Sequence, residues 1–464
     1  MQQHAGSPAP PPGCPAHGRV PLYTAEFGAD PESHYAHLRQ FGSSAPVEMA
    51  PGVEAELVTS YSAALRILQD PGTFVRDARR WRALREGRVP SDSPALPMMA
   101  YRPNALFSDG ADHARLRQAV TDSLATVDPH RLSRHVEQVA DYLIGRFADR
   151  PGGRADLVTD YAQQLPLLVY SNLFGCPADI GDRVIFGISG IFEGVDAEKA
   201  NEVLAGALYE LVTLKRSTPG DDLTSRMMQH PAGLDDDEMV NQLVTLLSGG
   251  TAPLMSLIST GAALMLGDEK YSGTQYTTGL LVEDAVNEVL WKYAPIANYA
   301  VHYPVQDVDL DGRLLEADQP VVISFAAANT DPALADDTSA LRGRAHLAFG
   351  AGPHVCPAKD PAVLISVAAI ERLLNRVTDI DLAVDFADLA WQPTPWSRTL
   401  AALPVRFTPV SPAARRPAGR GTASGPGSAT GSGPGGGSAE PSRGTAQPGK
   451  GNRWSTFLAW LKGM

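Results

Sequence analysis

The chain has 464 residues, 44% of them hydrophobic, which is enough to bury a large core. Its formal net charge of -13 argues against a nucleic-acid-binding surface on the main body. Its three cysteines, Cys14, Cys176 and Cys356, are too few for a disulfide framework and favour a reducing, cytoplasmic location.

Residues 1–20 are polar and rich in proline, without the apolar stretch of a signal peptide or membrane anchor, and we expect them to be disordered. Residues 21–410 contain no second linker and no internal repeat, so we expect a single large domain there. Helical spacing of apolar residues, closed by glycine or proline, occurs at 30–42, 61–74 and 130–153. Strand patterns are few and are clearest at 55–61, 321–329 and 403–410. This pattern predicts a mainly α fold with small β-sheets.

The last part of the chain differs in composition from the body. Residues 411–452 consist mostly of Gly, Ser, Pro and Ala, which predicts a flexible linker. Residues 453–464 place Trp454, Phe457 and Leu461 at spacings of three and four, which predicts a short amphipathic helix. A tethered helix of this kind is suited to docking on a protein partner or a membrane surface, and the alternative is a frayed tail or one folded back on the body.

The most informative short motif is FGAGPHVC, which ends at Cys356. Gly350 and Gly352 allow backbone conformations closed to other residues, and residues 357–377 follow as a strong amphipathic helix pattern. A helix N-terminus stabilises a thiolate, so Cys356 is a candidate zinc ligand, catalytic nucleophile or axial haem ligand. Zinc is the weakest of these because no CxxC pair exists. A nucleophile would have only His354 nearby as a base. The alternative to all three is that Cys356 is a small buried side chain with a structural role.

The segment LAFGAGPHVC resembles the cysteine-ligand loop of the cytochrome P450 superfamily of haem-thiolate monooxygenases. Further segments similar to family motifs occur in the family's order, beginning at Asp109, Thr218, Ala327 and Leu400. The resemblance covers residues 21–410 and implies a cytochrome P450-type domain that binds haem b, the iron protoporphyrin IX. It also implies oxidation of a small or medium organic substrate with dioxygen and electrons from a ferredoxin-type donor.

The same resemblance implies roles for individual residues. Cys356 becomes the axial ligand of the iron, with Phe349 beside the sulfur and with Gly350 and Gly352 allowing the backbone to approach. The residues that meet the haem carboxylates are then His113, Arg117 and His354, with His302 at or next to the place of the family's usual arginine. The alternative for the HARLR segment that contains His113 and Arg117 is a solvated basic helix face.

Two further departures from the family pattern affect the expected chemistry. The family's central helix carries an acid and an alcohol over the iron, but this chain has Thr251 and Ala252 there, followed by Pro253. The proton-delivery pair is therefore missing, and Thr251, or Ser248 with ordered water, is the expected catalytic substitute. We also expect Pro253 to kink the helix.

The family's Glu-x-x-Arg ion pair is also changed, because Glu288 is followed by Trp291, as in an actinobacterial subfamily. We expect Lys292 to pair with Glu288, or the Trp291 N–H to donate to it, or Glu288 to be less buried.

Two functions remain open from the sequence. The first is a haem-thiolate monooxygenase, with peroxide-driven oxidation as a variant, whose redox partner docks on local basic residues. The second is a haem-binding regulatory or scaffold protein that acts through partner association, which the missing acid–alcohol pair and the tethered helix favour. The basic residues proposed for docking are Arg79, Arg80, Arg82, Arg85, Arg115 and Arg117.

Overall fold

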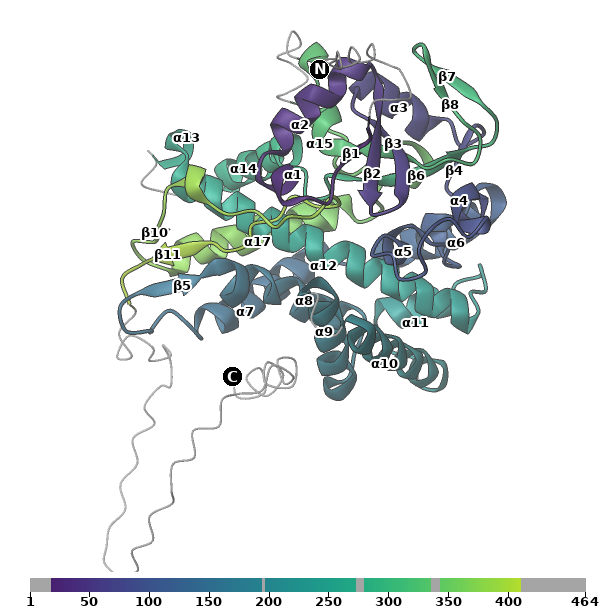
Figure 1. Ribbon diagram of the computed structural model, residues 1–464. Helices are drawn as coiled ribbons and strands as arrows, with labels where there is room; N and C mark the ends of the chain where they lie inside the picture. The colour runs from purple at the N-terminus through teal and green to yellow at the C-terminus, as the bar shows by residue number, and fades with distance from the viewer. Residues whose placement is uncertain (1–17, 194–196, 273–278, 335–342, 410–464) are drawn as a thin grey trace, which may run out of the picture.

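The computed structural model describes residues 18–193, 197–272, 279–334 and 343–409. Helices form the larger part of this chain, and the strands gather mainly at one end, next to the N-terminal helices (Figure 1). The architecture is the mainly α fold with small sheets that the sequence predicts. The predictions for residues 411–452 and 453–464, and for nearly all of 1–20, fall outside the described residues.

The largest sheet has six strands in the order β1-β2-β3-β9-β6-β4. Within it β1 pairs parallel with β2 and β3 pairs parallel with β9, through Leu57 opposite Val322, while the other pairs are antiparallel. The strands of this sheet are β1 (Val20–Pro21), β2 (Ser44–Ala50), β3 (Val53–Val58), β9 (Val321–Ser324), β6 (Asn298–Pro304) and β4 (Phe74–Val75). The smaller sheets contain β10 (Asp381–Leu382), β11 (Pro404–Arg406) and β5 (Arg154–Asp156), and the hairpin β7 (Val308–Leu310) and β8 (Arg313–Leu315).

The strand predicted at 321–329 is too long. Strand β9 ends at Ser324, whose side chain accepts a hydrogen bond from the Ala327 N–H and caps helix α15 (Phe325–Asn329). The alanine run after the cap is made of strong helix formers, so the chain turns helical while remaining apolar.

The predicted helices are found, with one correction. The helix expected over 130–153 is α7 (Pro129–Ile144), which ends at Gly145, several residues before the Pro-Gly pair that was expected to stop it. The other helices are α1 (Ala25–Ala29), α2 (Pro31–Leu38), α3 (Tyr61–Gln69), α4 (Arg82–Arg85), α5 (Leu96–Met99), α6 (Gly110–Leu124), α8 (Gln164–Leu173), α9 (Ala178–Glu193), α10 (Ala197–Ser217), α11 (Leu223–Gln229), α12 (Asp236–Gly267), α13 (Glu269–Ser272), α14 (Gly279–Lys292) and α17 (Lys359–Arg376).

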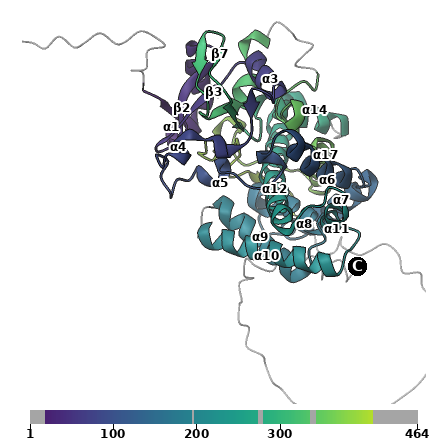
Figure 2. The same ribbon diagram turned by 90° about the vertical axis from the view of Figure 1, so that its right-hand side faces the viewer.

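Helix α12 is the centre of the helical part. Asp235 and Glu238 begin it with a reciprocal capping box, and the helix continues as one element through Pro253. It packs against α8, α10, α14 and α17, and Figure 2 shows α9 and α10 side by side beneath it. Among the described helices only α12 is long and apolar enough to cross a membrane, and more than half of its apolar stretch is buried against other helices, as in a core helix.

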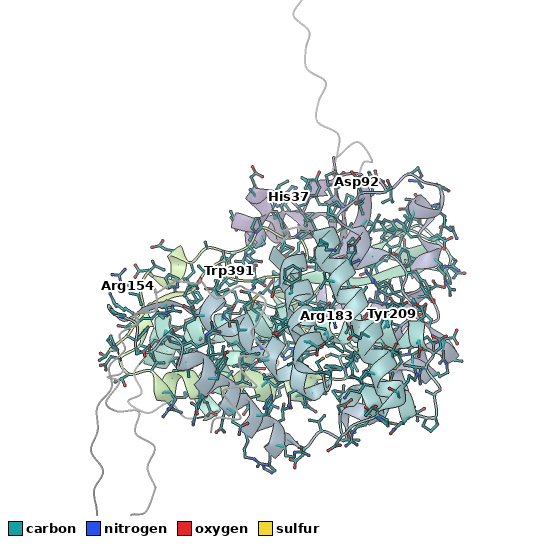
Figure 3. The ribbon with its side chains drawn as sticks, turned by 90° about the horizontal axis from the view of Figure 1, so that it is seen from below. His37, Asp92, Arg154, Arg183, Tyr209 and Trp391 are labelled. Atoms are coloured by element: carbon teal, nitrogen blue, oxygen red, sulfur yellow. The ribbon has the colours of Figure 1, made fainter. Side chains whose placement is uncertain are left out.

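The α9–α10 pair forms the outer layer on the side opposite the main sheet. Its exposed surface carries Tyr209, which is 48% exposed, next to Arg183 of the neighbouring helix (Figure 3). Arg183 forms an ion pair with Glu210 at 2.6 Å, which ties the two helices together at their surface. Such an exposed pair contributes little to stability, so the apolar contact between the helices holds this layer in place.

Candidate active site

The turn before α17 holds Cys356 by backbone hydrogen bonds. The Cys356 N–H donates to the Phe349 carbonyl at 2.8 Å, and the Gly350 N–H donates to the Leu347 carbonyl at 2.7 Å. Burial raises the pKa of the Cys356 thiol, while the Ala358 N–H and the charge of Arg117 act in the opposite direction. The helix-terminus effect expected from the sequence is therefore present but is outweighed by burial. A bound metal ion would deprotonate the thiol outright.

The two positions in this turn require glycine for different structural reasons. Both have positive φ, +71° at Gly350 and +66° at Gly352. A Cβ atom at Gly352 would lie 2.0 Å from the carbonyl oxygen of Leu68 on α3, whereas a Cβ at Gly350 would lie 3.8 Å from its nearest neighbour. Gly350 lines the cavity described next, but Gly352 does not, so Gly352 is needed for contact with α3.

A cavity of about 290 Å³ lies between α12 and the Cys356 turn. This volume is close to the lower limit of ligand pockets, roughly 300–1,000 Å³. The α12 residues that line it include Gly249, Gly250, Pro253, Leu254 and Leu257, and the turn contributes Phe349, Gly350, His354 and Cys356. Most of the remaining lining is apolar, so the cavity is a hydrophobic chamber with a thiol in its wall.

One end of the cavity carries two arginines and a pair of histidines. Arg76, Arg117 and His354 line it, and the His113 ring lies 4.0 Å from the His354 ring, centroid to centroid. The only carboxylate in this group among the described residues is Asp109, 3.9 Å from His354 Nε2. Burial, with Arg76 and His113 nearby, lowers the pKa of His354 to about 4. This end of the cavity therefore has more positive than negative charge, which favours an anionic ligand.

The helix α6 residues lie at the cationic end of the cavity. Arg117 lines the cavity and the His113 ring packs against His354, which does, so HARLR is not simply a solvated helix face. Arg117 donates hydrogen bonds to the Val355 carbonyl, next to Cys356, and to the Thr121 hydroxyl. The His113 Nε2 is buried and has no hydrogen-bond partner among the described residues, which leaves a polar atom available for a ligand.

His302 does not reach the cavity. It lies on β6, is 2% exposed, and its Nδ1–H donates to the Ala300 carbonyl at 2.5 Å. Burial, followed by the charges of Arg76 and His354, holds the pKa of His302 well below its usual value, so the ring is neutral. The expectation that His302 replaces the family's arginine at the carboxylate is not supported by this placement, because His302 is absent from the described lining and its ring bonds to the carbonyl of its own strand.

Ser248 and Thr251 also lie away from the cavity. The Thr251 hydroxyl donates to the Leu247 carbonyl of its own helix, and neither residue belongs to the described cavity lining. The helix instead turns Gly249, Gly250 and Pro253 toward the chamber, because these positions share one helical face. The structure therefore does not bring the two expected catalytic hydroxyls to the site.

Two cavity residues escaped the sequence reasoning. Tyr170 on α8 packs against Gly250, where a Cβ would lie 2.4 Å from the tyrosine ring. Burial, and then the nearby Cys356, raise the pKa of Tyr170, so its hydroxyl stays protonated. Arg76 was not among the basic residues singled out in the sequence, where the arginine run begins at Arg79. No motif distinguishes either residue, because each reaches the cavity through tertiary packing.

The structure also shows what replaces the family's Glu-x-x-Arg pair. Glu288 accepts hydrogen bonds from Lys270, Lys292 and Tyr271, each at 2.8 Å, so the expected pairing with Lys292 is confirmed. Burial alone would raise the pKa of Glu288, but these hydrogen bonds lower it to about 2. The expected donation from Trp291 to Glu288 is wrong.

Trp291 has a different partner, in the segment that leads to the cysteine turn. Its Nε1–H donates to the Gly343 carbonyl at 3.1 Å, and its ring meets the His346 ring edge-on. His346 in turn contacts the Phe349 ring, with centroids 5.8 Å apart. These contacts connect α14 to the turn that holds Cys356, which is the connection that the family's arginine would otherwise support.

Comparison with known proteins agrees with this geometry. No family model matches the chain. The cytochrome P450 monooxygenase PikC of Streptomyces venezuelae is 31% identical over 404 residues, which cover 84% of this chain and 94% of the relative. The 6-deoxyerythronolide B hydroxylase of Saccharopolyspora erythraea is 27% identical and covers 83% of this chain and 98% of its own.

Solved structures give the same result. The structure of CYP154C4 from Streptomyces sp. W2061 superposes with a TM-score of 0.74 at 27% identity, covering 84% of this chain and 97% of the other. The myxobacterial cytochrome P450 CYP267B1 in complex with myristic acid has a TM-score of 0.73 at 26% identity, covering 83% of this chain and 98% of the other.

Proposed function

The chain belongs to the cytochrome P450 superfamily of haem-binding monooxygenases, and on this basis we propose that it oxidises an apolar organic substrate in the cavity between α12 and the Cys356 turn. One observation carries the proposal. A hydrophobic chamber has the Cys356 thiol in its wall and two guanidinium groups, those of Arg76 and Arg117, at one end. Such a combination suits an apolar macrocycle that binds a thiol through its metal and carries carboxylates at one edge.

The described residues fit haem b. Cys356 would hold the iron, and Arg117 and His354, with the unpartnered Nε2 of His113 beside His354, would receive the carboxylates. Haem supplies the activation of dioxygen, which a thiolate ligand favours by pushing electron density onto the iron. Phe349 and Gly350 line the cavity next to the sulfur, and the apolar wall excludes water from it.

The polar side chains of the cavity lining indicate how a substrate is recognised. Gln242 accepts the Ala105 N–H at 3.0 Å, and the Thr245 hydroxyl accepts a hydrogen bond from Asn104 and donates to the Asn241 carbonyl. These groups are already engaged, so binding depends on shape and apolar contact. We therefore propose a small or medium hydrophobic substrate.

Electrons would come from a ferredoxin-type donor. The arginine run suggested by the sequence is a poor docking surface, because Arg79, Arg80, Arg82 and Arg85 each form an ion pair with a neighbouring Asp or Glu. Lys359 at the start of α17 is exposed and lies near Cys356. We propose that the donor docks over this turn, and that the enzyme works in the reducing cytoplasm that its few cysteines favour.

The alternative function is a haem-binding regulatory or scaffold protein that acts through partner association. The observation that favours it is the absence of Ser248 and Thr251 from the described cavity lining, which leaves proton delivery without its expected hydroxyls. The two functions differ in turnover but not in haem binding, so an experiment must measure both.

The test begins with the reduced carbon-monoxide difference spectrum of the purified protein and of Cys356→Ser. A Soret band shifted far to the red in the wild type, and lost in the variant, supports thiolate-bound haem. Titration with a fatty acid, a steroid and a macrolide should then change the spin state of the iron for at least one ligand. Turnover with a ferredoxin and its reductase, compared with the reductant consumed, separates a monooxygenase from a haem-binding partner protein.

A further inference from the structure

Arg76 is a buried cation without a counter-ion of its own. It lies in the connection between β4 and the short helix at Ala78–Arg80, is 3% exposed, and lines the cavity. Its Nε–H donates to the Leu106 carbonyl at 3.3 Å, and its guanidinium lies 6.0 Å from the centre of the Tyr299 ring. Within the described ranges, the guanidinium has no ion-pair partner, and its two terminal nitrogens have no hydrogen bond.

A buried guanidinium in this state needs a ligand. Arginine stays charged even where burial lowers its pKa, as it does for Arg76. A buried charge without an anion is costly, and a bound carboxylate removes that cost through paired N–H···O bonds. Because Arg76 faces the cavity and not solvent, the missing anion has to come from the cavity's occupant.

Asp109 holds Arg76 in this orientation without neutralising it. The Asp109 carboxylate accepts the backbone N–H of Arg76 at 2.9 Å and that of Asp77 at 3.0 Å. It also faces His354 Nε2 at 3.9 Å. One carboxylate therefore fixes the backbone next to Arg76 and lies beside the ring of His354, while the Arg76 side chain lines the cavity.

We propose that Arg76 binds a haem carboxylate in place of the arginine that is absent at His302, and that Asp109 is the positioning residue for both Arg76 and His354. The inference rests on the assignment of the cavity to haem. Under this proposal the guanidinium that pairs with the haem carboxylate comes from the segment after β4, whereas in the family it comes from the strand that contains His302. Arg76 and His302 are close enough for the charge of Arg76 to lower the pKa of His302.

The test measures how fast the ferric protein loses haem to an excess of haem-free myoglobin. Arg76→Gln should release haem roughly ten- to a hundredfold faster than the wild type, as expected when a charge-assisted hydrogen bond is lost. Arg76→Lys should fall between the two, because it keeps the charge but not the planar fork. The matched control is Arg79→Gln, which removes an exposed arginine paired with Asp77 and should leave the rate unchanged.

A second set of variants separates the charge from its position. His302→Gln should not change the haem release rate, whereas Arg76→Gln combined with His302→Arg should recover a slow rate if the family's arginine position is again filled. Asp109→Asn should accelerate release less than Arg76→Gln does. Fast release from His302→Gln together with slow release from Arg76→Gln would overturn the proposal.

Two other outcomes are distinguishable. If the wild type binds no haem, the proposed function itself fails. If the wild type binds haem and Arg76→Gln keeps it normally, but loses the spin-state change on titration with myristate, then Arg76 binds an anionic substrate and the inference is wrong. Melting of each haem-loaded variant, followed by far-UV circular dichroism, shows whether a fast release rate comes from unfolding.

Discussion

The pair Gly350→Ala and Gly352→Ala tests the reading of the cysteine turn. Both glycines have positive φ, so alanine costs roughly 1–2 kcal/mol at either position. At Gly352 the new methyl group would also lie 2.0 Å from the Leu68 carbonyl, and this atom belongs to the backbone of α3, which cannot rotate away. We therefore expect a free-energy loss of roughly 3–5 kcal/mol for Gly352→Ala, at the upper end for single substitutions.

The difference is large enough to measure. With an unfolding entropy of about 2.1 cal/mol/K per residue over about 390 residues, 1 kcal/mol shifts the melting temperature by about 1.2 °C. Gly350→Ala should therefore lower the Tm of the haem-loaded protein by about 1–2 °C, and Gly352→Ala by about 4–6 °C. Circular dichroism and urea unfolding give independent values. Equal shifts for the two variants would refute the contact between Gly352 and α3 as the reason for the glycine.

Three further predictions concern residues outside the cavity lining. Thr251→Val should leave the product formed per reductant unchanged, because the Thr251 hydroxyl is bound to Leu247; a tenfold drop would restore Thr251 to catalysis. Glu288→Gln should cost about 1 kcal/mol near neutral pH. Since hydrogen bonding lowers the folded pKa of Glu288 to about 2, the difference from the wild type should persist above about pH 5 and vanish toward about pH 2 in urea unfolding, whereas a constant difference would contradict the ion pairs. Trp291→Phe keeps a ring but loses the N–H bond to Gly343, so it should cost about 1 kcal/mol in the same assay, and a neutral result would make that bond irrelevant.

The sequence predicted the parts of the site that depend on local pattern. Arg117 lines one end of the cavity and His113 packs against His354 at the same end, because a spacing of four places the two residues on one face of α6. Cys356 and Gly350 lie in one short turn whose glycines adopt positive φ, which the sequence pattern indicates. The pairing of Glu288 with Lys292 follows from the same helical spacing.

The parts that depend on tertiary contacts could not be read from the pattern. Helix α12 is apolar on most of its faces, so its sequence does not reveal that Gly249 and Gly250 face the cavity while Thr251 does not. Arg76 is separated by 33 positions from Asp109, the residue that fixes its backbone. His302 is at or next to the expected position in sequence, but its ring bonds to the Ala300 carbonyl of β6 and it is absent from the described lining.

Two of the departures from the family pattern are compensated from elsewhere in the chain. Lys270, from a separate helix, joins Lys292 on Glu288, and Arg76 brings a guanidinium to the cavity end that His302 does not reach. The first compensation stabilises the fold, and the second concerns binding of the cofactor. Haem binding should therefore be close to that of a family member with the usual arginines.

The departure on α12 is of another kind, because it concerns proton delivery. Within the described lining, Tyr170 is the one uncharged hydroxyl group without a hydrogen-bond partner, and it packs directly against Gly250. A protonated hydroxyl at this place can donate to an ordered water in the cavity, which Thr251 cannot do while it is bound to Leu247. Oxygen activation by this chain therefore depends on whether Tyr170 and water supply the proton. If they do not, the protein binds haem well and turns over slowly, which is the behaviour expected of the regulatory alternative.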